Sequence, residues 1–131
     1  TFRLGTKDAA YLLQGLVAMD EAQVREAAGG RTGFMPVLLG IQQKTIRYKR
    51  ADPQEHWKSW KELIEQQQRT GVGRGDCEDL ASAVAGELRF NGIPARTYVY
   101  QSAPTLYHVV VKTKRWGLLD PSRSAGMEGN G

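Results

Sequence analysis

Hydrophobic residues in the first half of the chain recur every three to four positions, the spacing that places them on one face of an α-helix. This pattern predicts a helix over residues 7–28. Asp20-Glu21-Ala22-Gln23 has the form of a capping box, so we expect a break or kink near Asp20 and a short second helix after it. Gly29-Gly30 is typical of a helix end, because glycine readily adopts the left-handed conformation that closes a helix.

Two further helices are predicted before residue 70. Pro36 is a favourable first residue for a helix over residues 37–48. Asp52-Pro53-Gln54-Glu55 combines an N-cap, a proline at the first helical position and an acid three residues after the cap. It predicts a helix from there to about residue 69. The glycines within residues 70–75 then indicate a flexible connector.

The second half begins with one more helix and then changes period. A helix is predicted over residues 77–90, where Asn91-Gly92 and Pro94 stop it. Small residues make this helix slim enough to pack closely against a sheet: Ala81, Ala83, Ala85 and Gly86. Hydrophobic residues then alternate with a period of two, which predicts three strands at residues 95–101, 106–113 and 116–120.

This order of elements, helices followed by an antiparallel meander, predicts an α+β fold and not an alternating βαβ one. We expect the central cysteine-bearing helix to pack on a small antiparallel sheet. The 131 residues are enough for one domain with its own core. Residues 1–45 form its helical N-terminal part, and the Gly/Ser-rich residues 123–131 are expected to be a flexible tail.

Composition excludes several classes of function. No stretch is long and apolar enough to span a membrane. The net charge of +4 comes from basic residues spread along the chain, which favours a solvated surface over a nucleic-acid site. One cysteine allows no internal disulfide, and one cysteine with two histidines makes a zinc site very unfavourable. We predict no metal and no cofactor; the location in the cell stays open, with the cytoplasm slightly favoured, and so does the oligomeric state.

The single cysteine has the setting of a nucleophile. Cys77 follows the glycine-rich stretch Gly73-Arg74-Gly75-Asp76 and opens the slim helix. At a helix N-terminus, unpaired backbone N–H groups and the helix dipole favour negative charge. The thiolate is the form that attacks carbonyl carbons, so we expect the pKa of Cys77 to be lowered there.

A base and a residue to orient it are predicted on neighbouring strands. His108 lies in the middle of the second strand, and Asp120 ends the third. A three-residue loop of Thr113, Lys114 and Arg115 between these strands places His108 directly opposite Asp120 on one face. A two-residue loop directs the two side chains to opposite faces. The catalytic interpretation therefore requires an odd-numbered loop or a bulge.

The roles follow from this arrangement. Cys77 attacks, His108 accepts its proton and later protonates the leaving amine, and Asp120 orients the imidazole and stabilises its charged form. The oxyanion requires two donors. The backbone N–H of Cys77 is one, and the indole N–H of Trp57 or the side-chain amide of Gln42 is a candidate for the other.

Each residue also has a structural interpretation. A lone cysteine is often a small buried hydrophobe, a histidine among valines is compatible with a core position, and an aspartate before proline often caps a turn. Trp57 fits a core position better than a site. The combination of the three residues on adjacent elements favours the catalytic interpretation.

At these residues the chain resembles the transglutaminase-like, papain-like cysteine enzymes, especially their bacterial branch. The resemblance extends over about residues 45–122, and its matching words are Ile46-Arg47-Tyr48, Gly73-Arg74-Gly75-Asp76-Cys77-Glu78-Asp79-Leu80-Ala81, Leu88 with Asn91-Gly92-Ile93-Pro94-Ala95-Arg96, Tyr107-His108-Val109 and Trp116-Gly117-Leu118-Leu119-Asp120-Pro121-Ser122. It implies a Cys77–His108–Asp120 triad in a catalytic core over residues 46–122. Many relatives have an aromatic residue at position 109, and their sheet usually continues beyond the aspartate, so we expect a minimal or truncated sheet here.

The resemblance implies acyl transfer through a thioester, on a protein or peptide substrate. Water as acceptor makes the protein a cysteine peptidase or amidase, which bacterial relatives favour. A lysine amine as acceptor makes it a protein-crosslinking transglutaminase. A third hypothesis is a non-catalytic binding module on the same fold.

Overall fold

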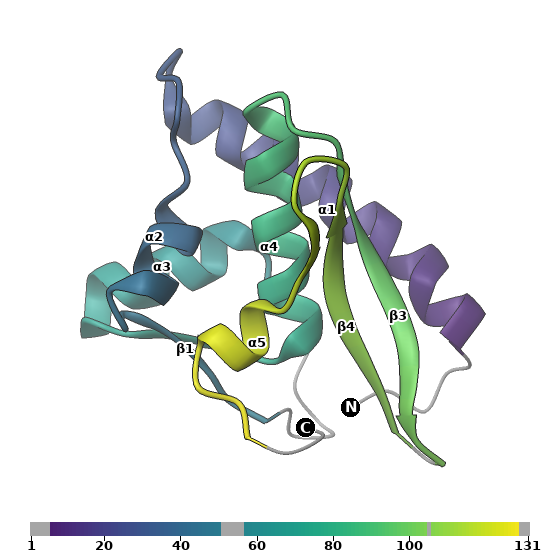
Figure 1. The fold of residues 1–131 in the computed structure, drawn as a ribbon. Coiled ribbons are helices and arrows are strands. Elements are labelled where there is room, and N and C mark those ends of the chain that lie inside the picture. The colour runs from purple at the N-terminus through teal and green to yellow at the C-terminus, as the bar shows by residue number, and fades with distance from the viewer. Residues whose placement is uncertain (1–5, 51–56, 105, 129–131) are drawn as a thin grey trace.

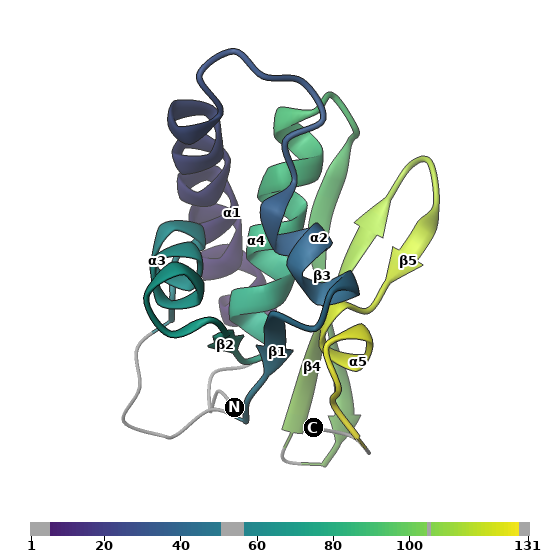
Figure 2. The ribbon, with the colours of Figure 1, turned by 90° about the vertical axis from the view of Figure 1, so that its left-hand side faces the viewer.

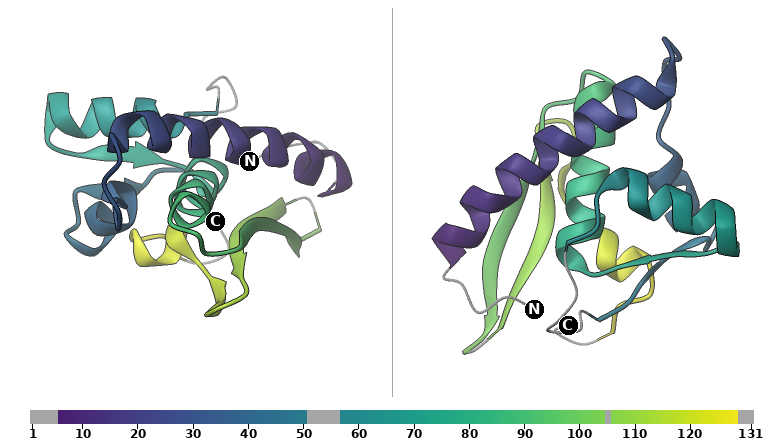
Figure 3. Two further views of the ribbon diagram at one scale, coloured as in Figure 1. Left: turned by 90° about the horizontal axis from the view of Figure 1, so that it is seen from above. Right: turned by 180° about the vertical axis from the view of Figure 1, so that it is seen from behind.

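Helix α4 (Cys77–Phe90) stands between helix α1 (Thr6–Ala28) and an antiparallel sheet in the computed structural model, which describes residues 6–50, 57–104 and 106–128. Figure 1 shows this α+β arrangement, and the view from above in Figure 3 shows α4 end-on at the centre. The expected fold class is confirmed. The remaining elements are α2 (Pro36–Gln42), β1 (Ile46–Tyr48), α3 (Trp60–Thr70), β2 (Gly73–Gly75), β3 (Ala95–Ala103), β4 (Leu106–Thr113), β5 (Gly117–Leu119) and α5 (Pro121–Ser124).

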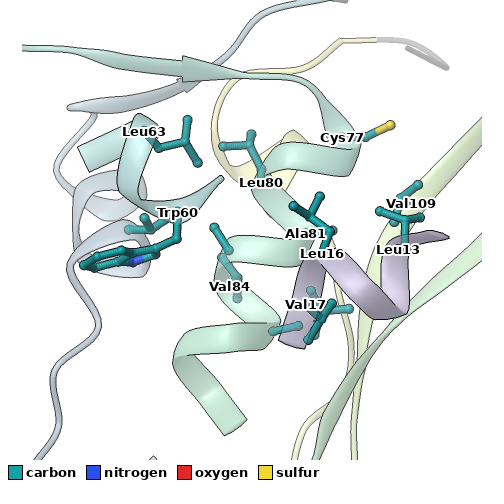
Figure 4. Packing of buried hydrophobic residues seen from close by; sticks show 14 of the residues in the cluster. Leu13, Leu16, Val17, Trp60, Leu63, Cys77, Leu80, Ala81, Val84 and Val109 are labelled. Atoms are coloured by element: carbon teal, nitrogen blue, oxygen red, sulfur yellow. The ribbon is translucent and has the colours of Figure 1, made fainter. Parts of the chain in front are cut away.

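The small residues of α4 let its neighbours approach closely. A Cβ atom at Gly86 would lie 2.9 Å from the backbone nitrogen of Glu21, so α1 rests directly on this glycine. Leu80, Val84 and Leu88 are fully buried on α4. Figure 4 shows buried side chains of α1, α3 and β4 packed around this helix. The slim helix therefore packs tightly on two sides, against α1 as well as against the sheet.

The sheet has the strand order β3-β4-β5 and is antiparallel throughout. β3 and β4 pair along almost their whole length, with a register shift between Gln101 and Ala103. β5 is short and pairs only with residues 111–113 of β4. The edge of β4 beyond β5 is therefore free for another element, and the beginning of α4 approaches it there (Figure 2).

A second, parallel pair of strands precedes the cysteine. β1 pairs with β2, with Tyr48 opposite Gly75. The expected flexible connector over residues 70–75 is therefore wrong for its second half. A Cβ at Gly73 would lie 2.7 Å from the carbonyl oxygen of Leu63, so this glycine is needed for close packing on α3. The pair fixes the chain immediately before Cys77.

The predicted break in the first helix is wrong. α1 is continuous from Thr6 to Ala28, and its capping residues serve another helix. Asp20 accepts a hydrogen bond from the backbone N–H of Trp60 (2.9 Å), and Gln23 accepts one from that of Lys61 (2.9 Å). These are the first two amides of α3, which have no acceptor within their own helix.

Three other boundaries differ from the sequence predictions. α2 ends at Gln42, because Lys44 turns the chain with a φ of 65° and residues 46–48 pair as β1. The predicted helix start at Asp52-Pro53-Gln54-Glu55 lies outside the described residues, and α3 begins at Trp60 with Ser59 as its N-cap. Part of the expected tail is ordered: α5 covers residues 121–124, and Ala125 and Met127 are buried. No helix of the described residues has the length and apolar character needed to cross a membrane.

Candidate active site

Cys77 is the first residue of α4, and two carboxyl groups fix the chain around it. Asp76 is the N-cap and accepts a hydrogen bond from the backbone N–H of Asp79 (3.0 Å). Asp79 in turn accepts one from the N–H of Asp76 (3.1 Å). This reciprocal capping box is the reason that the helix starts at the cysteine. Helical geometry leaves the backbone N–H of Cys77 without an acceptor in its own helix.

His108 and Asp120 are brought together on one face of the sheet. The His108 Nε2 atom lies 3.1 Å and 3.0 Å from the two carboxylate oxygens of Asp120. The His108 side chain is only 3% exposed. Because an ionised carboxylate can only accept, Nε2–H is the donor, and Nδ1 is left as the nitrogen that can exchange a proton with a neighbouring group.

The loop between β4 and β5 has an odd number of residues, which the catalytic interpretation requires. It begins one residue later in the chain than predicted. Thr113 pairs with Gly117, so the loop is Lys114-Arg115-Trp116. His108 is therefore not directly opposite Asp120. The two positions keep the same parity along their strands, so their side chains share a face as diagonal neighbours.

The pKa of Asp120 is lowered. Burial alone would raise this pKa, but the hydrogen bond from His108 and the backbone N–H of Arg123 offset it, as do the charges of both side chains. Asp120 also caps α5 by accepting from the N–H of Arg123 at 3.2 Å. The carboxyl group therefore stays ionised, and its orientation is fixed from two elements.

Cys77 lies against the free edge of β4. The backbone N–H of Val109, the residue after His108, lies close enough to the Cys77 sulfur to favour its charged form and so to lower the pKa of the thiol. Figure 4 shows the sulfur leaving the first turn of α4 on the side of the strand that carries Val109. The side chain is 8% exposed. The nucleophile candidate thus sits at the point where β5 no longer covers β4.

The environment of the thiol differs from the sequence prediction. The pKa of Cys77 is raised, first by burial and then by the negative charges of Glu78 and Asp76. The thiol donates a hydrogen bond to Glu78 Oε2 at 3.4 Å. The expected lowering by the helix N-terminus is therefore wrong for the resting state, because burial and two carboxyl groups outweigh the dipole.

Glu78 belongs to a buried acidic group at the start of α4. It is fully buried, and its pKa is raised by burial and by the charge of Asp76. The pKa of Asp79 is raised for the same two reasons. Burial raises the pKa of the Tyr107 phenol, and its interaction with the Glu78 carboxyl raises it further. Within the described residues, no group of three or more His, Cys, Asp or Glu side chains is arranged to hold a metal ion.

Tyr48 is a candidate that the sequence analysis did not single out for chemistry. It ends β1 opposite Gly75, two residues before Cys77, and is partly buried against the core. Burial raises its pKa to about 12, and the charges of Cys77, Asp76 and Glu78 contribute. Its phenol is therefore a protonated donor within electrostatic reach of the sulfur. In the sequence, the only indication of a role for Tyr48 was its place in the family-matching segment Ile46-Arg47-Tyr48.

The two candidates for the second oxyanion donor, Trp57 and Gln42, lie in different parts of the fold. Trp57 lies just before α3 and packs, half-buried, against the core. Gln42 is the last residue of α2, and its side chain is exposed. Both residues remain predictions for the second oxyanion donor.

Comparison with protein families gives one match. The model of the family described as "Transglutaminase-like superfamily" matches residues 39–121, which include Cys77, His108 and Asp120. No curated protein and no solved structure matches the chain.

Proposed function

Because the chain belongs to the transglutaminase-like superfamily, we propose that it is a cysteine-nucleophile acyl transferase acting through a thioester, and that water is its acceptor. It is then a peptidase or amidase. The observation that carries the proposal is the hydrogen-bonded pair of His108, on β4, and Asp120, which follows β5. The backbone N–H of Val109, the residue after His108, lies close enough to the Cys77 sulfur to lower the pKa of the thiol.

Acylation begins with the thiol in its neutral form. The raised pKa of Cys77 means that the resting enzyme holds S–H and not a thiolate. As the sulfur attacks the carbonyl carbon, its proton passes to Nδ1 of His108, and the carbonyl oxygen becomes an oxyanion. His108 then gives this proton to the leaving nitrogen. The C–N bond breaks, the amine departs, and a thioester remains on Cys77.

Hydrolysis repeats these steps with water. Nδ1 of His108 takes a proton from water as its oxygen attacks the thioester carbon. Collapse of the second oxyanion breaks the C–S bond, and the proton returns from His108 to sulfur. Asp120 holds the imidazole through Nε2 and stabilises its charged form in both half-reactions.

The oxyanion requires donors on the carbonyl side of the substrate. The backbone N–H of Cys77 is the first. Trp57 and Gln42 are the donors proposed from the sequence, and the phenol of Tyr48 is added by its place beside Gly75 and by its protonated state.

The test is product analysis with a panel of protein substrates, with and without a biotinylated primary amine as competing acceptor. We expect cleavage products from the wild-type protein and none from Cys77→Ala. Biotin incorporation or crosslinks without cleavage would replace hydrolysis by transamidation, since both reactions share the thioester.

Detection of the intermediate separates an enzyme from a binding module. After incubation with 4-nitrophenyl acetate and acid quench, the intact mass should show one acetyl group on wild-type protein and none on Cys77→Ala. Binding of peptides with neither acylation nor product would contradict the proposed function.

A further inference from the structure

An aromatic row runs along the exposed face of β3 beside His108. Tyr100 pairs with His108 across the two strands, and their rings meet edge-to-face with centroids 5.7 Å apart and an interplanar angle of 82°. The Tyr98 ring stacks on Tyr100 with centroids 6.2 Å apart. The Lys112 Nζ atom lies 5.9 Å from the centre of the Tyr98 ring.

This row is accessible although the histidine is not. Tyr98 and Tyr100 are 39% and 37% exposed, whereas His108 is 2% exposed. On the β3 side, a molecule that reaches the imidazole therefore passes over Tyr100. Two exposed tyrosine rings in a row also present a rigid surface, because Tyr100 is held by the His108 ring and Tyr98 by Tyr100 and Lys112.

The proposed reaction fixes which part of a substrate meets this surface. His108 protonates the leaving nitrogen, so that nitrogen must lie beside the imidazole during acylation. The residues on the amine side of the scissile bond extend away from that nitrogen, while the acyl side remains with Cys77. The neighbours of the imidazole on its accessible side are therefore the neighbours of the leaving group.

We propose that Tyr98 and Tyr100 form the subsite for the amine side of the substrate, and that this subsite favours an apolar or aromatic side chain there. The proposal rests on the acyl transfer described above and names the chemical class of its leaving group. Aromatic pairs prefer stacked and edge-to-face contacts, which the exposed parts of the two rings offer.

Acceptor competition tests the subsite directly. An amine that attacks the acyl-enzyme occupies the site that the leaving amine vacated, because aminolysis is the reverse of acylation. The acetyl-enzyme is formed with 4-nitrophenyl acetate, and ethylamine or 2-phenylethylamine competes with water. The ratio of N-acetyl amine to acetate then measures binding of each amine.

We expect wild-type protein to favour 2-phenylethylamine over ethylamine. Tyr98→Ala and Tyr100→Ala should each reduce this preference for 2-phenylethylamine over ethylamine by about threefold to tenfold. Tyr100→Phe keeps the ring and should keep the preference. Tyr11→Ala is the matched control, because Tyr11 is an exposed tyrosine on α1.

Three outcomes would overturn the subsite. In the first, the preference is unchanged in both alanine variants. In the second, the ratio of N-acetyl amine to acetate falls equally for both amines in Tyr100→Ala. In the third, wild-type protein shows no preference between the amines. The second outcome would make Tyr100 a support for His108 only. If wild-type protein forms no acetyl-enzyme above the Cys77→Ala background, the proposed function fails, and the subsite fails with it.

Discussion

At the scale of single residues, the thiol of Cys77 is held between two opposing influences. The Val109 N–H and the start of α4 favour a thiolate, whereas burial and the carboxyl groups of Glu78 and Asp76 oppose it and prevail. The thiol donates to Glu78 at rest. In the proposed mechanism, the Glu78 carboxyl group keeps the thiol protonated until a substrate is in place and His108 accepts the proton.

Replacing Glu78 by glutamine should release this restraint. Glu78→Gln keeps the volume of the fully buried side chain and removes its negative charge, which raises the pKa of Cys77. We expect a lower thiol pKa and at least a severalfold faster reaction with iodoacetamide at pH 8, since the thiolate is the reacting form. The measurement is the pH profile of alkylation by mass spectrometry. Glu65→Gln, at an exposed position of α3, is the control; an unchanged profile in Glu78→Gln would contradict this role.

Replacing Asp120 by asparagine separates its two tasks. Asparagine is as good an N-cap as aspartate, so α5 should persist. The amide cannot stabilise a charged imidazole as the carboxylate does. We therefore expect Asp120→Asn to lower the turnover rate by about two to four orders of magnitude, with a melting temperature close to that of the wild type. Wild-type turnover in this variant would show that Asp120 is only a cap.

Replacing Tyr48 by phenylalanine tests the proposed donor. The ring and its packing remain, while the hydroxyl, which is within electrostatic reach of Cys77, is lost. Removal of one oxyanion donor typically slows turnover by about 10²–10³. Alkylation by iodoacetamide forms no oxyanion, so its rate should not change. Trp57→Phe and Gln42→Ala are compared in the same assay. The variant that slows turnover without changing the alkylation rate identifies the donor.

At the scale of elements, helix ends are satisfied by residues far away in sequence. Glu87 on α4 accepts from the N–H groups of Val37 (2.7 Å) and Leu38 (3.0 Å) at the start of α2, which has no side-chain cap of its own. It also accepts from the indole of Trp60 at 2.8 Å. Asp20 serves α3 in the same way. The buried acids of α4 and α1 thereby join α2 and α3 to these two helices.

Removing the Asp20 carboxyl should weaken the start of α3. Asp20→Ala leaves the buried N–H of Trp60 without its acceptor, while alanine itself is favourable within α1. We expect a loss of about 1–3 kcal/mol in the free energy of unfolding, measured by urea denaturation. Glu26→Ala is the control, because Glu26 is an exposed acid of the same helix. A stability equal to that of the control would contradict the capping role.

Elements with local signals were predictable, and those defined by distant partners were not. The start of α4 at Cys77, its end at Asn91-Gly92 and the strands β3 and β4 all follow from caps, glycines and a period of two. β1 and β2 are three residues each and exist through mutual pairing, which no local pattern encodes. Asp20 and Gln23 match a local capping-box pattern, but their side chains accept hydrogen bonds from the first backbone N–H groups of α3.

At the scale of the whole molecule, the same division applies to the candidate site. The pairing of His108 with Asp120 was predictable only as one of two alternatives, because the face that each side chain occupies depends on the length of the hairpin loop. The loop has three residues but is shifted by one position from the predicted one. The state of the thiol was not, because it depends on burial and on the charge of Glu78 within the folded core. Tyr48 and the Tyr98–Tyr100 row likewise become neighbours of the site only through strand pairing.

The buried acids also make the stability of the whole fold depend on pH. Burial raises the pKa of Asp20 and of Glu87 to about 7, from ordinary values of 3.8 and 4.5. The native state therefore binds more protons than the unfolded chain in this range. Their stabilising contribution is complete below pH 4 and is lost as the pH rises toward 7. The raised pKa values of Glu78 and Asp79 act in the same direction, whereas the lowered pKa of Asp120 acts only at lower pH.

We accordingly expect the free energy of unfolding to fall between pH 4.5 and pH 7, by on the order of 3 kcal/mol for each of Asp20 and Glu87. Urea denaturation across this range measures the slope. Asp20→Asn keeps an acceptor for Trp60 but cannot titrate, so its slope should be shallower than that of the wild type. Stability that rises with pH over this interval would show that these carboxyl groups are ionised in the native core and held by their N–H donors alone.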